Sequence, residues 1–467
     1  MRLRIPPLAR RTSGPTRPSA PGARLGWLDA LRGVAALIVA LHHFDVLRLL
    51  PFGGVVWRNF DMGLFGVMLF FIVSGYIIPA SLERRGDVRG FWIGRIFRIY
   101  PALIAAFVVL MLLLPDGDGS IALLRTGDDL VSLTANGLML QDFLGVTNGM
   151  NVTWTLCYEM VFYFLVTALF TRGLHRQSAP IAVGFAAAAL AVGTAVGTGT
   201  QLLSAHLGSP RPLLLIVTPI VLAGLAGALS GNRWLTQAGA LVLGGTGLAL
   251  VALNGRAPLF ETAMIFATMF AGTVVYRAQH GELGRFPALL ACGIVIGAGA
   301  LVGPLYNRGY VVEHTWTASW QAWTLSYLGA WALFGLGFLA RKRRFPKVLT
   351  WLGAISFSVY LVHIPLLHVI EPLVGVPPLP SSTPGRIAWT AIYLGAVLGL
   401  SHLMYHLVEM PMQRLGRRVQ QAANRRRPHP AAATPTPPDA PSPGPASAPA
   451  PAPAPAPAAS LTGPPRS

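Results

Sequence analysis

The chain has few cysteines and few charged residues for its length. Two of its 467 residues are cysteines, Cys157 and Cys292, and both lie inside apolar segments without metal-ligand spacing around them. A disulfide framework is therefore excluded, and we expect both to be small buried side chains. Charged residues make up only 11% of the chain, whereas a soluble domain carries about 25%. This composition indicates a polytopic membrane protein.

Acidic residues are scarcer than basic ones. The chain has 36 lysines and arginines against 17 aspartates and glutamates, which gives a formal net charge of +19. Such an excess suits a nucleic-acid partner when the basic residues form a patch interleaved with aromatic residues. Here they lie at the ends of apolar runs and in two tails. We therefore expect no nucleic-acid partner and interpret the distribution as membrane topology.

Hydrophobic residues are abundant and make up 53% of the chain. A run of about 20 apolar residues is long enough to cross a bilayer as a helix. One pair of runs between residues 180 and 303 could instead be half-helices. We therefore predict an all-α polytopic bundle of ten to twelve transmembrane helices in the plasma membrane. The candidate runs centre on 28–48, 62–82, 96–114, 152–171, 180–198, 212–230, 234–253, 259–277, 286–303, 319–339, 349–370 and 387–409.

The loops between these runs alternate in charge. Acidic or weakly charged loops at 115–130 and 371–386 are separated by basic ones. Because basic loops stay in the cytoplasm, both termini are predicted to be cytoplasmic. No internal repeat is evident, which disfavours an inverted-repeat transporter. The basic segments are the N-terminal arm, 83–95, 171–176, 232–233, 276–285, 341–347 and 413–418.

Composition divides the chain into three parts. Residues 1–24 are a basic arm rich in proline, serine and glycine, which we expect to be disordered. A signal-peptide n-region is the alternative, disfavoured because the next run is studded with polar residues and lacks a small-x-small cleavage site. Residues 25–418 form the predicted membrane domain. Residues 419–467 are a Pro/Ala-rich tail that cannot bury a core and is predicted to be disordered.

The first apolar run, "LDALRGVAALIVALHHF" (28–44), carries a polar stripe. At 100° per residue, His43 lies about 20° beyond three full turns from Arg32 and roughly 16 Å along the axis. Asp29 lies about 40° off the same line, whereas His42 points about 100° away from His43. An ionisable group at the centre of a span costs roughly 2.5–3.5 kcal/mol by insertion scales. We expect the stripe to face the bundle interior; a helix-end charge pair plus a buried histidine is the alternative.

A second acidic anomaly lies in "TWTLCYEMVFYFL" (153–165). Glu159 interrupts an otherwise apolar helix, with Thr155 one turn before it and Tyr163 one turn after it. Both neighbours share its face and could hydrogen-bond to it. An unpaired buried carboxylate is costly, and protonated His43 is a candidate partner.

"GRIFRIYP" (94–101) places Arg95 and Arg98 on one face at the predicted cytoplasmic mouth of the third span. Two interpretations stay open. The pair either anchors the helix by the positive-inside rule or clamps a phosphate.

Three further motifs carry polar or small residues within apolar sequence. "SFSVYLVHIPLL" (356–367) aligns Tyr360 and His363 on a polar seam. "FFIVSGYIIP" (70–79) contains Ser74 beside a glycine, small residues that allow a helix or ligand to approach closely. Glu409 ends the last span, where we expect capping and pairing with nearby arginines.

Together and in this order, these motifs resemble those of the acyltransferase-3 family of integral membrane acyltransferases, from residue 25 to about 418. The family's Arg-x10-His pattern falls on Arg32 and His43, and its Arg-x-x-Arg pattern falls on Arg95 and Arg98. Its Trp-Ser-Leu-x-x-Glu motif is matched by Trp154, Leu156 and Glu159, with Thr155 where serine is common.

The resemblance implies transfer of an acyl group, often acetyl from acetyl-CoA, to a hydroxyl of a carbohydrate or other extracytoplasmic or lipophilic acceptor. It also implies an essential histidine. Some family members carry a fused SGNH-type hydrolase domain outside the cytoplasm. This chain ends in the predicted tail, so we expect any such partner to be a separate protein.

We therefore predict one cavity that holds the donor and, deeper inside it, His43. His43 would act as general base or transient acyl carrier, with Glu159 orienting it. A proton-coupled transporter or flippase of a glycan or lipid-linked substrate is the alternative, because intramembrane His and Glu also suit it. No metal is expected. The predicted site residues are His43, Glu159 and Asp29 (catalytic), Arg32, Arg95, Arg98 and Ser74 (acyl-CoA), and His363, Tyr360 and Trp154 (acceptor).

Overall fold

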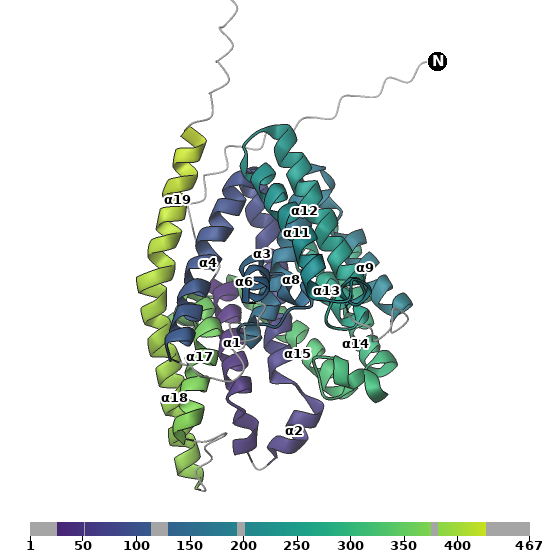
Figure 1. Cartoon of the computed structure of the whole chain (residues 1–467). Coiled ribbons are helices and arrows are strands. Elements are labelled where there is room, and N and C mark those ends of the chain that lie inside the picture. Colours follow the sequence, from purple (N-terminus) through teal and green to yellow (C-terminus); the bar gives the residue numbers. More distant parts are fainter. Residues whose placement is uncertain (1–25, 51, 114–128, 194–200, 375–381, 426–467) are drawn as a thin grey trace, which may run out of the picture. The chain divides into compact units, whose positions relative to one another are not determined.

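The structure is a computed structural model that describes residues 26–50, 52–113, 129–193, 201–374 and 382–425. This part of the chain contains helices and no strands, which confirms the all-α class (Figure 1). The predicted arm (1–24) and residues 426–467 of the predicted tail lie outside the described residues. Residues up to Gln420 form one unit, and every contact given below lies within it.

The long helices coincide with the predicted runs, and shorter helices fill several loops. The elements are α1 (Gly26–His43), α2 (Gly53–Asn59), α3 (Met62–Arg85), α4 (Val88–Leu113), α6 (Asp129–Leu138), α7 (Gln141–Leu144), α8 (Trp154–Thr171), α9 (Ser178–Val192), α10 (Leu202–His206), α11 (Pro210–Leu229), α12 (Arg233–Leu253), α13 (Leu259–Gln279), α14 (Arg285–Tyr306), α15 (Trp320–Leu339), α16 (Lys347–Ala354), α17 (Ser356–Val374), α18 (Thr383–Met404) and α19 (Met410–Arg425).

Nine helices in the described part of the chain are long and apolar enough to cross a membrane. The count becomes ten if α16 and α17, which are bent by 66° at a short break, form one span. The two remaining predicted runs also become helices, but α9 has only 15 residues and α1 carries the polar stripe. Most of α1 is nevertheless buried, with Ala35, Ala36 and Ala40 fully enclosed. Its polar groups are therefore surrounded largely by protein.

The core of the bundle is built on α3, α8 and α13. Of the apolar window of α13, 89% is buried, and the value is 78% for both α3 and α8. α18, by contrast, is mostly exposed and continues into α19 through a π-helical turn at Tyr405–Glu409 (Figure 1). α19 continues to Arg425, past the boundary predicted at residue 418. Of the two cysteines, Cys157 is buried as predicted, whereas Cys292 is only partly buried.

Loops that the charge pattern assigns to the cytoplasm contact one another. Arg277, at the end of α13, donates hydrogen bonds to Glu83 at the end of α3 and to Glu282 (2.7 Å). It also donates to the carbonyl oxygen of His175 (2.6 Å). These residues belong to three separate segments predicted to lie on one side of the membrane, so the contacts support the predicted alternation.

The loops assigned to the opposite side also meet. The Ser319 hydroxyl donates to the carbonyl oxygen of Arg58 at 2.6 Å. Arg256 Nη1 lies 3.5 Å from Asp142 Oδ1. Helix order and loop charge therefore agree on two groups of loops. The assignment of the basic group to the cytoplasm stays a prediction.

Candidate active site

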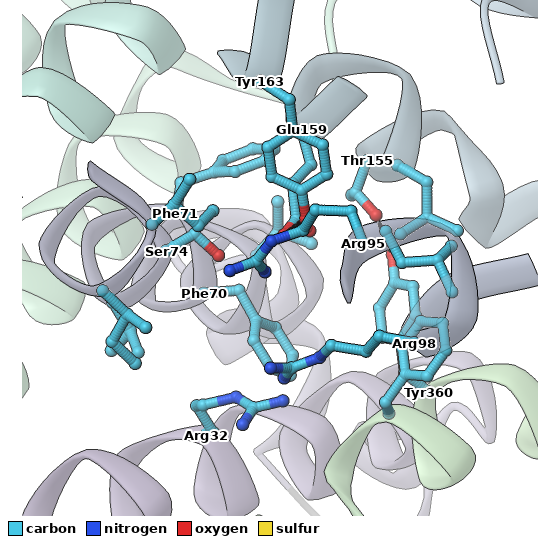
Figure 2. A pocket seen from close by; sticks show the side chains of 17 residues that line it. Arg32, Phe70, Phe71, Ser74, Arg95, Arg98, Thr155, Glu159, Tyr163 and Tyr360 are labelled. Carbon is cyan, nitrogen blue, oxygen red and sulfur yellow. Dashed lines mark hydrogen bonds between the residues drawn. The ribbon is translucent and has the colours of Figure 1, made fainter. Parts of the chain in front are cut away.

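A polar cavity lies between α1, α3, α4, α8 and α17 and holds about 780 Å³ of space not filled by atoms, including its open mouth. Eight of the described lining residues carry polar or charged groups, and Figure 2 labels all of them. They are Arg32, Ser74, Arg95, Arg98, Thr155, Glu159, Tyr163 and Tyr360, while apolar side chains such as Phe70 and Phe71 complete the wall. Motifs far apart in the sequence therefore converge on one space.

The three cavity arginines come from two helices. Arg32 extends from α1, and Arg95 and Arg98 extend from α4, with Arg98 close enough to act electrostatically on Arg32 (Figure 2). Arg95 donates to Ser81 Oγ at 3.1 Å and lies over the ring of Tyr163, 5.2 Å from its centroid. Among the described residues, no ion pair within 4.0 Å joins a carboxylate to Arg95 or Arg98.

Glu159 is the single acidic residue among those that line the cavity in the described part of the chain. The Tyr163 hydroxyl donates a hydrogen bond to it, as the spacing of one turn predicts. Thr155 does not take the same role. Its hydroxyl pairs with Tyr360 Oη at 2.7 Å and donates to the carbonyl oxygen of Val152 at 3.1 Å. The cavity therefore contains three positive groups and one negative group.

Ser74 lines the cavity, and its neighbour Gly75 fits against α13. A Cβ atom at Gly75 would lie 1.8 Å from the carbonyl oxygen of Met269. The backbones of α3 and α13 therefore approach closely only because the residue is glycine. This confirms the predicted close helix contact at the small-residue pair.

His43 and His363 form a pair. His43 Nδ1 and His363 Nε2 are 3.4 Å apart, and the ring centroids are separated by 5.1 Å. In each ring Nδ1 also lies 3.0 Å from the carbonyl oxygen four residues earlier, that of Val39 or Val359. A carbonyl oxygen only accepts, so Nδ1 carries the hydrogen in each neutral ring. The Nε2 atom of His43 then keeps its lone pair for a substrate.

The structure does not place His43 in the same cavity as the arginines, which corrects the prediction of one shared cavity. His43 lines a separate cavity of about 500 Å³, together with His42, Trp57 and Met62. It makes no hydrogen bond to Glu159 in the described residues. The reason is the length of α1: eleven residues of helix separate Arg32 from His43 along the axis.

Aromatic rings connect the two cavities. Tyr360 lines the arginine-containing cavity, and its ring centroid is 6.0 Å from that of His363. His363 in turn contacts His43, which lines the second cavity. Phe70 packs edge-on against Tyr360 at 5.7 Å. The predicted seam of Tyr360 and His363 therefore lies at the boundary between the cavities.

Besides His363, which lies at the boundary, two predicted site residues line neither cavity. Trp154 stacks on Trp316, with ring centroids 4.1 Å apart. Asp29 lies one helical turn before Arg32 and acts on it electrostatically.

The sequence predicts that Glu409 caps the last span and pairs with nearby arginines, and the structure buries it beside the site. Its carboxylate accepts a hydrogen bond from the Ser358 hydroxyl on α17 and lies near enough to Arg98 and Arg32 to attract both. Glu409 belongs to the π-helical turn that follows α18, and such turns are frequent at functional sites. The sequence signal that could have placed Glu409 at the site is an acidic residue within the apolar stretch before Pro411.

Comparison with known proteins gives a consistent set of similarities. Residues 25–406 match the family model described as "Acyltransferase domain". The chain is similar to nodulation protein 10 of Rhizobium leguminosarum bv. viciae, with 25% identity over 389 residues, which cover 74% of this chain and 100% of that protein. No solved structure matches the chain.

Two further relatives match this chain over only part of their own length. A Bacillus subtilis (strain 168) protein named "Putative peptidoglycan O-acetyltransferase YrhL" is 24% identical over 413 residues, which cover 83% of this chain and 55% of that protein. A Staphylococcus aureus (strain COL) protein named "Putative O-acetyltransferase" is 31% identical over 110 residues, or 22% of this chain and 15% of that protein. The chain thus spans about half of the Bacillus protein.

Proposed function

The chain belongs to the acyltransferase-3 family, and from this premise we propose that it moves an acyl group, in the simplest case acetyl, from acyl-CoA to a hydroxyl group. The proposed acceptor is a carbohydrate or another extracytoplasmic or lipophilic molecule. Peptidoglycan is one candidate, because it appears in the name of a relative.

The observation that carries this proposal is the convergence of three arginines on one cavity. Arg32, Arg95 and Arg98 line it, and among the described residues no ion pair within 4.0 Å joins Arg95 or Arg98 to a carboxylate. Positive groups in a low-dielectric space repel one another unless an anion balances them. Phosphate groups accept charge-assisted hydrogen bonds from arginine in the required geometry. A phosphorylated donor such as acyl-CoA supplies that anion.

The histidine pair supplies the base. The lone pair on His43 Nε2 accepts the proton of the acceptor hydroxyl while the hydroxyl oxygen attacks the thioester carbonyl. The carbon–sulfur bond then breaks, and the leaving thiolate takes the proton back from His43. His363 holds the His43 ring from the side of Nδ1. Transient acylation of His43 remains the alternative route to the same products.

Two cavities give the reactants separate entrances. The donor enters beside the arginines, and the acceptor approaches the cavity of His42 and His43. The acyl end must therefore pass the boundary formed by Phe70, Tyr360 and His363. In this proposal the positive arginines bind the donor, and the neutral imidazoles transfer the proton of the acceptor hydroxyl.

The test uses purified protein in lipid nanodiscs. Wild type, His43→Ala and His368→Ala would be incubated with radiolabelled acetyl-CoA, with and without a lipid and glycan extract that includes peptidoglycan. His368 is the matched control because its Nδ1 also lies 3.0 Å from a carbonyl oxygen four residues earlier, on the same helix as His363. We expect wild type and the control to transfer label and His43→Ala to lose transfer.

The outcomes separate the hypotheses. Transfer retained by His43→Ala would remove His43 from the mechanism. Wild-type protein that neither binds acetyl-CoA nor releases CoA would overturn the proposed reaction. The transporter alternative would then need a proton-coupled uptake assay. None of the relatives described above is named as a transporter.

A further inference from the structure

A second basic cavity lies beneath α19, next to the arginine-containing cavity. It holds about 560 Å³ and is bounded by the end of α3, the start of α4 and one face of α19. Arg95 and Arg98 line both cavities, so the two spaces meet at these side chains. The cavity beneath α19 therefore extends the arginine-containing cavity toward the side where the predicted cytoplasmic loops gather.

The charged residues that line the cavity beneath α19 all have one sign. Four of its lining residues are arginines, Arg85, Arg95, Arg98 and Arg417, and none of the ten described lining residues is acidic. Gln413 and Gln420 from α19 add amide groups. Arginines around a hollow concentrate positive potential and favour an anionic ligand. Simple anchoring of α19 to lipid headgroups would need no hollow beneath the helix.

α19 is held close to the bundle where it covers this cavity. A Cβ atom at Gly416 would lie 2.6 Å from Phe97 Cβ on α4, so only glycine allows the present approach. Phe97 also lines the cavity and offers an aromatic face, against which a nucleobase can stack. The family match ends at residue 406, so the helix that carries Arg417 lies beyond it.

We propose that the cavity beneath α19 binds the phosphorylated nucleotide end of the acyl-CoA donor. This inference rests on the donor proposed above. The nucleotide end of CoA carries a diphosphate and a 3′-phosphate, whereas its pantetheine arm is uncharged. The phosphates then lie among Arg85, Arg95, Arg98 and Arg417, and the arm extends past the two shared arginines into the larger cavity. Arg417 and Gln413 are donor-binding residues in this arrangement.

The test compares two acetyl donors in the nanodisc assay. One is acetyl-CoA and the other is the acetyl thioester of N-acetylcysteamine, which has a thioester and no nucleotide. Arg417→Gln should raise KM for acetyl-CoA about tenfold, the loss expected for one charge-assisted hydrogen bond. It should leave turnover of the truncated donor unchanged. Adenosine 3′,5′-bisphosphate should compete with acetyl-CoA in wild type and about tenfold less well in Arg417→Gln.

Two further variants make the result specific. Arg418→Gln removes the same charge from the next position, which does not line the cavity, and should match wild type with both donors. Gly416→Val changes no charge but pushes α19 away from Phe97, so it should raise KM for acetyl-CoA alone.

The failures of the two proposals are distinguishable. If wild type uses neither donor, the proposed reaction itself fails. If wild type uses acetyl-CoA but Arg417→Gln behaves like Arg418→Gln, only the nucleotide site is overturned. Loss of both donors in Arg417→Gln would also overturn it, because that result indicates a structural role.

Discussion

Two groups of arginines in this molecule differ in their partners, and the difference separates stability from binding. Arg277 is 1% exposed and donates hydrogen bonds to two carboxylates and a carbonyl oxygen. Arg32, Arg95 and Arg98 line a cavity, and among the described residues Arg95 and Arg98 form no ion pair within 4.0 Å. The charge of Arg277 is balanced by carboxylates of the protein, whereas the cavity arginines face a space that a ligand can enter.

The comparison shows that a buried arginine is not by itself evidence of a binding site. The acidic residues that neighbour a buried arginine indicate whether it stabilises the fold or binds a ligand. At Arg277, removal of the side chain leaves two acidic groups without their cation. In the cavity, removal of one arginine gives up attraction to nearby acids but also relieves repulsion between like charges. Stability should therefore fall most at Arg277, whereas donor binding should fall most in the cavity.

The largest expected effect is at Arg277. Arg277→Gln should destabilise the protein by about 3–5 kcal/mol, because breaking one side of a buried ion pair leaves uncompensated charge. Thermal unfolding of the detergent-solubilised protein would measure the change. The double variant Glu83→Gln/Arg277→Gln should recover part of the loss. A single variant as stable as wild type would contradict the structural role.

Arg98→Gln should show the opposite pattern. We expect its kcat/KM for acetyl-CoA to fall by about tenfold to a hundredfold, which corresponds to the loss of hydrogen bonds to a charged group. Its melting temperature should fall far less than that of Arg277→Gln, because the lost attraction to Glu409 is offset by the lost repulsion with Arg32. Destabilisation comparable to that of Arg277→Gln would erase the distinction between the two groups.

Ligand binding should stabilise the protein through the cavity arginines. At a concentration of acetyl-CoA 100 times Kd, unfolding of wild type should cost about 2.7 kcal/mol more than without ligand. At the same concentration, a tenfold weaker Arg98→Gln should gain only about half of that. Melting curves with and without acetyl-CoA test this, and Arg418→Gln serves as the control that should match wild type. Equal shifts in Arg98→Gln and wild type would argue against phosphate binding at Arg98.

The smallest effect concerns the acidic group of the cavity. The hydroxyl of Tyr163 holds Glu159 by a hydrogen bond. Tyr163→Phe keeps the ring beneath Arg95 but frees Glu159, which can then pair with a cavity arginine. We expect KM for acetyl-CoA to rise by about threefold to tenfold, in line with one hydrogen bond of about 1 kcal/mol. A Tyr158→Phe variant, which removes a hydroxyl on the same helix that hydrogen-bonds to Thr262, away from Glu159, serves as the control and should have a smaller effect.

Much of the site was predictable because it depends on helical periodicity. The Tyr163–Glu159 hydrogen bond follows from a spacing of four residues. The placement of Arg95 and Arg98 in one cavity follows from a spacing of three. The break between α16 and α17 was not predictable, because the overall hydropathy of 349–370 fits one helix, whereas the 66° bend depends on packing.

The sequence by itself determined the all-α class, the order of the helices and which polar residues share a face. These features are local, since 3.6 residues per turn and hydropathy fix them without reference to other helices. Only the tertiary structure decided that His43 pairs with His363, that Arg277 pairs with Glu83, and that Arg417 on α19 lines the cavity beneath that helix. Partners on different helices depend on how closely the backbones approach, and side-chain volume at each contact sets that distance.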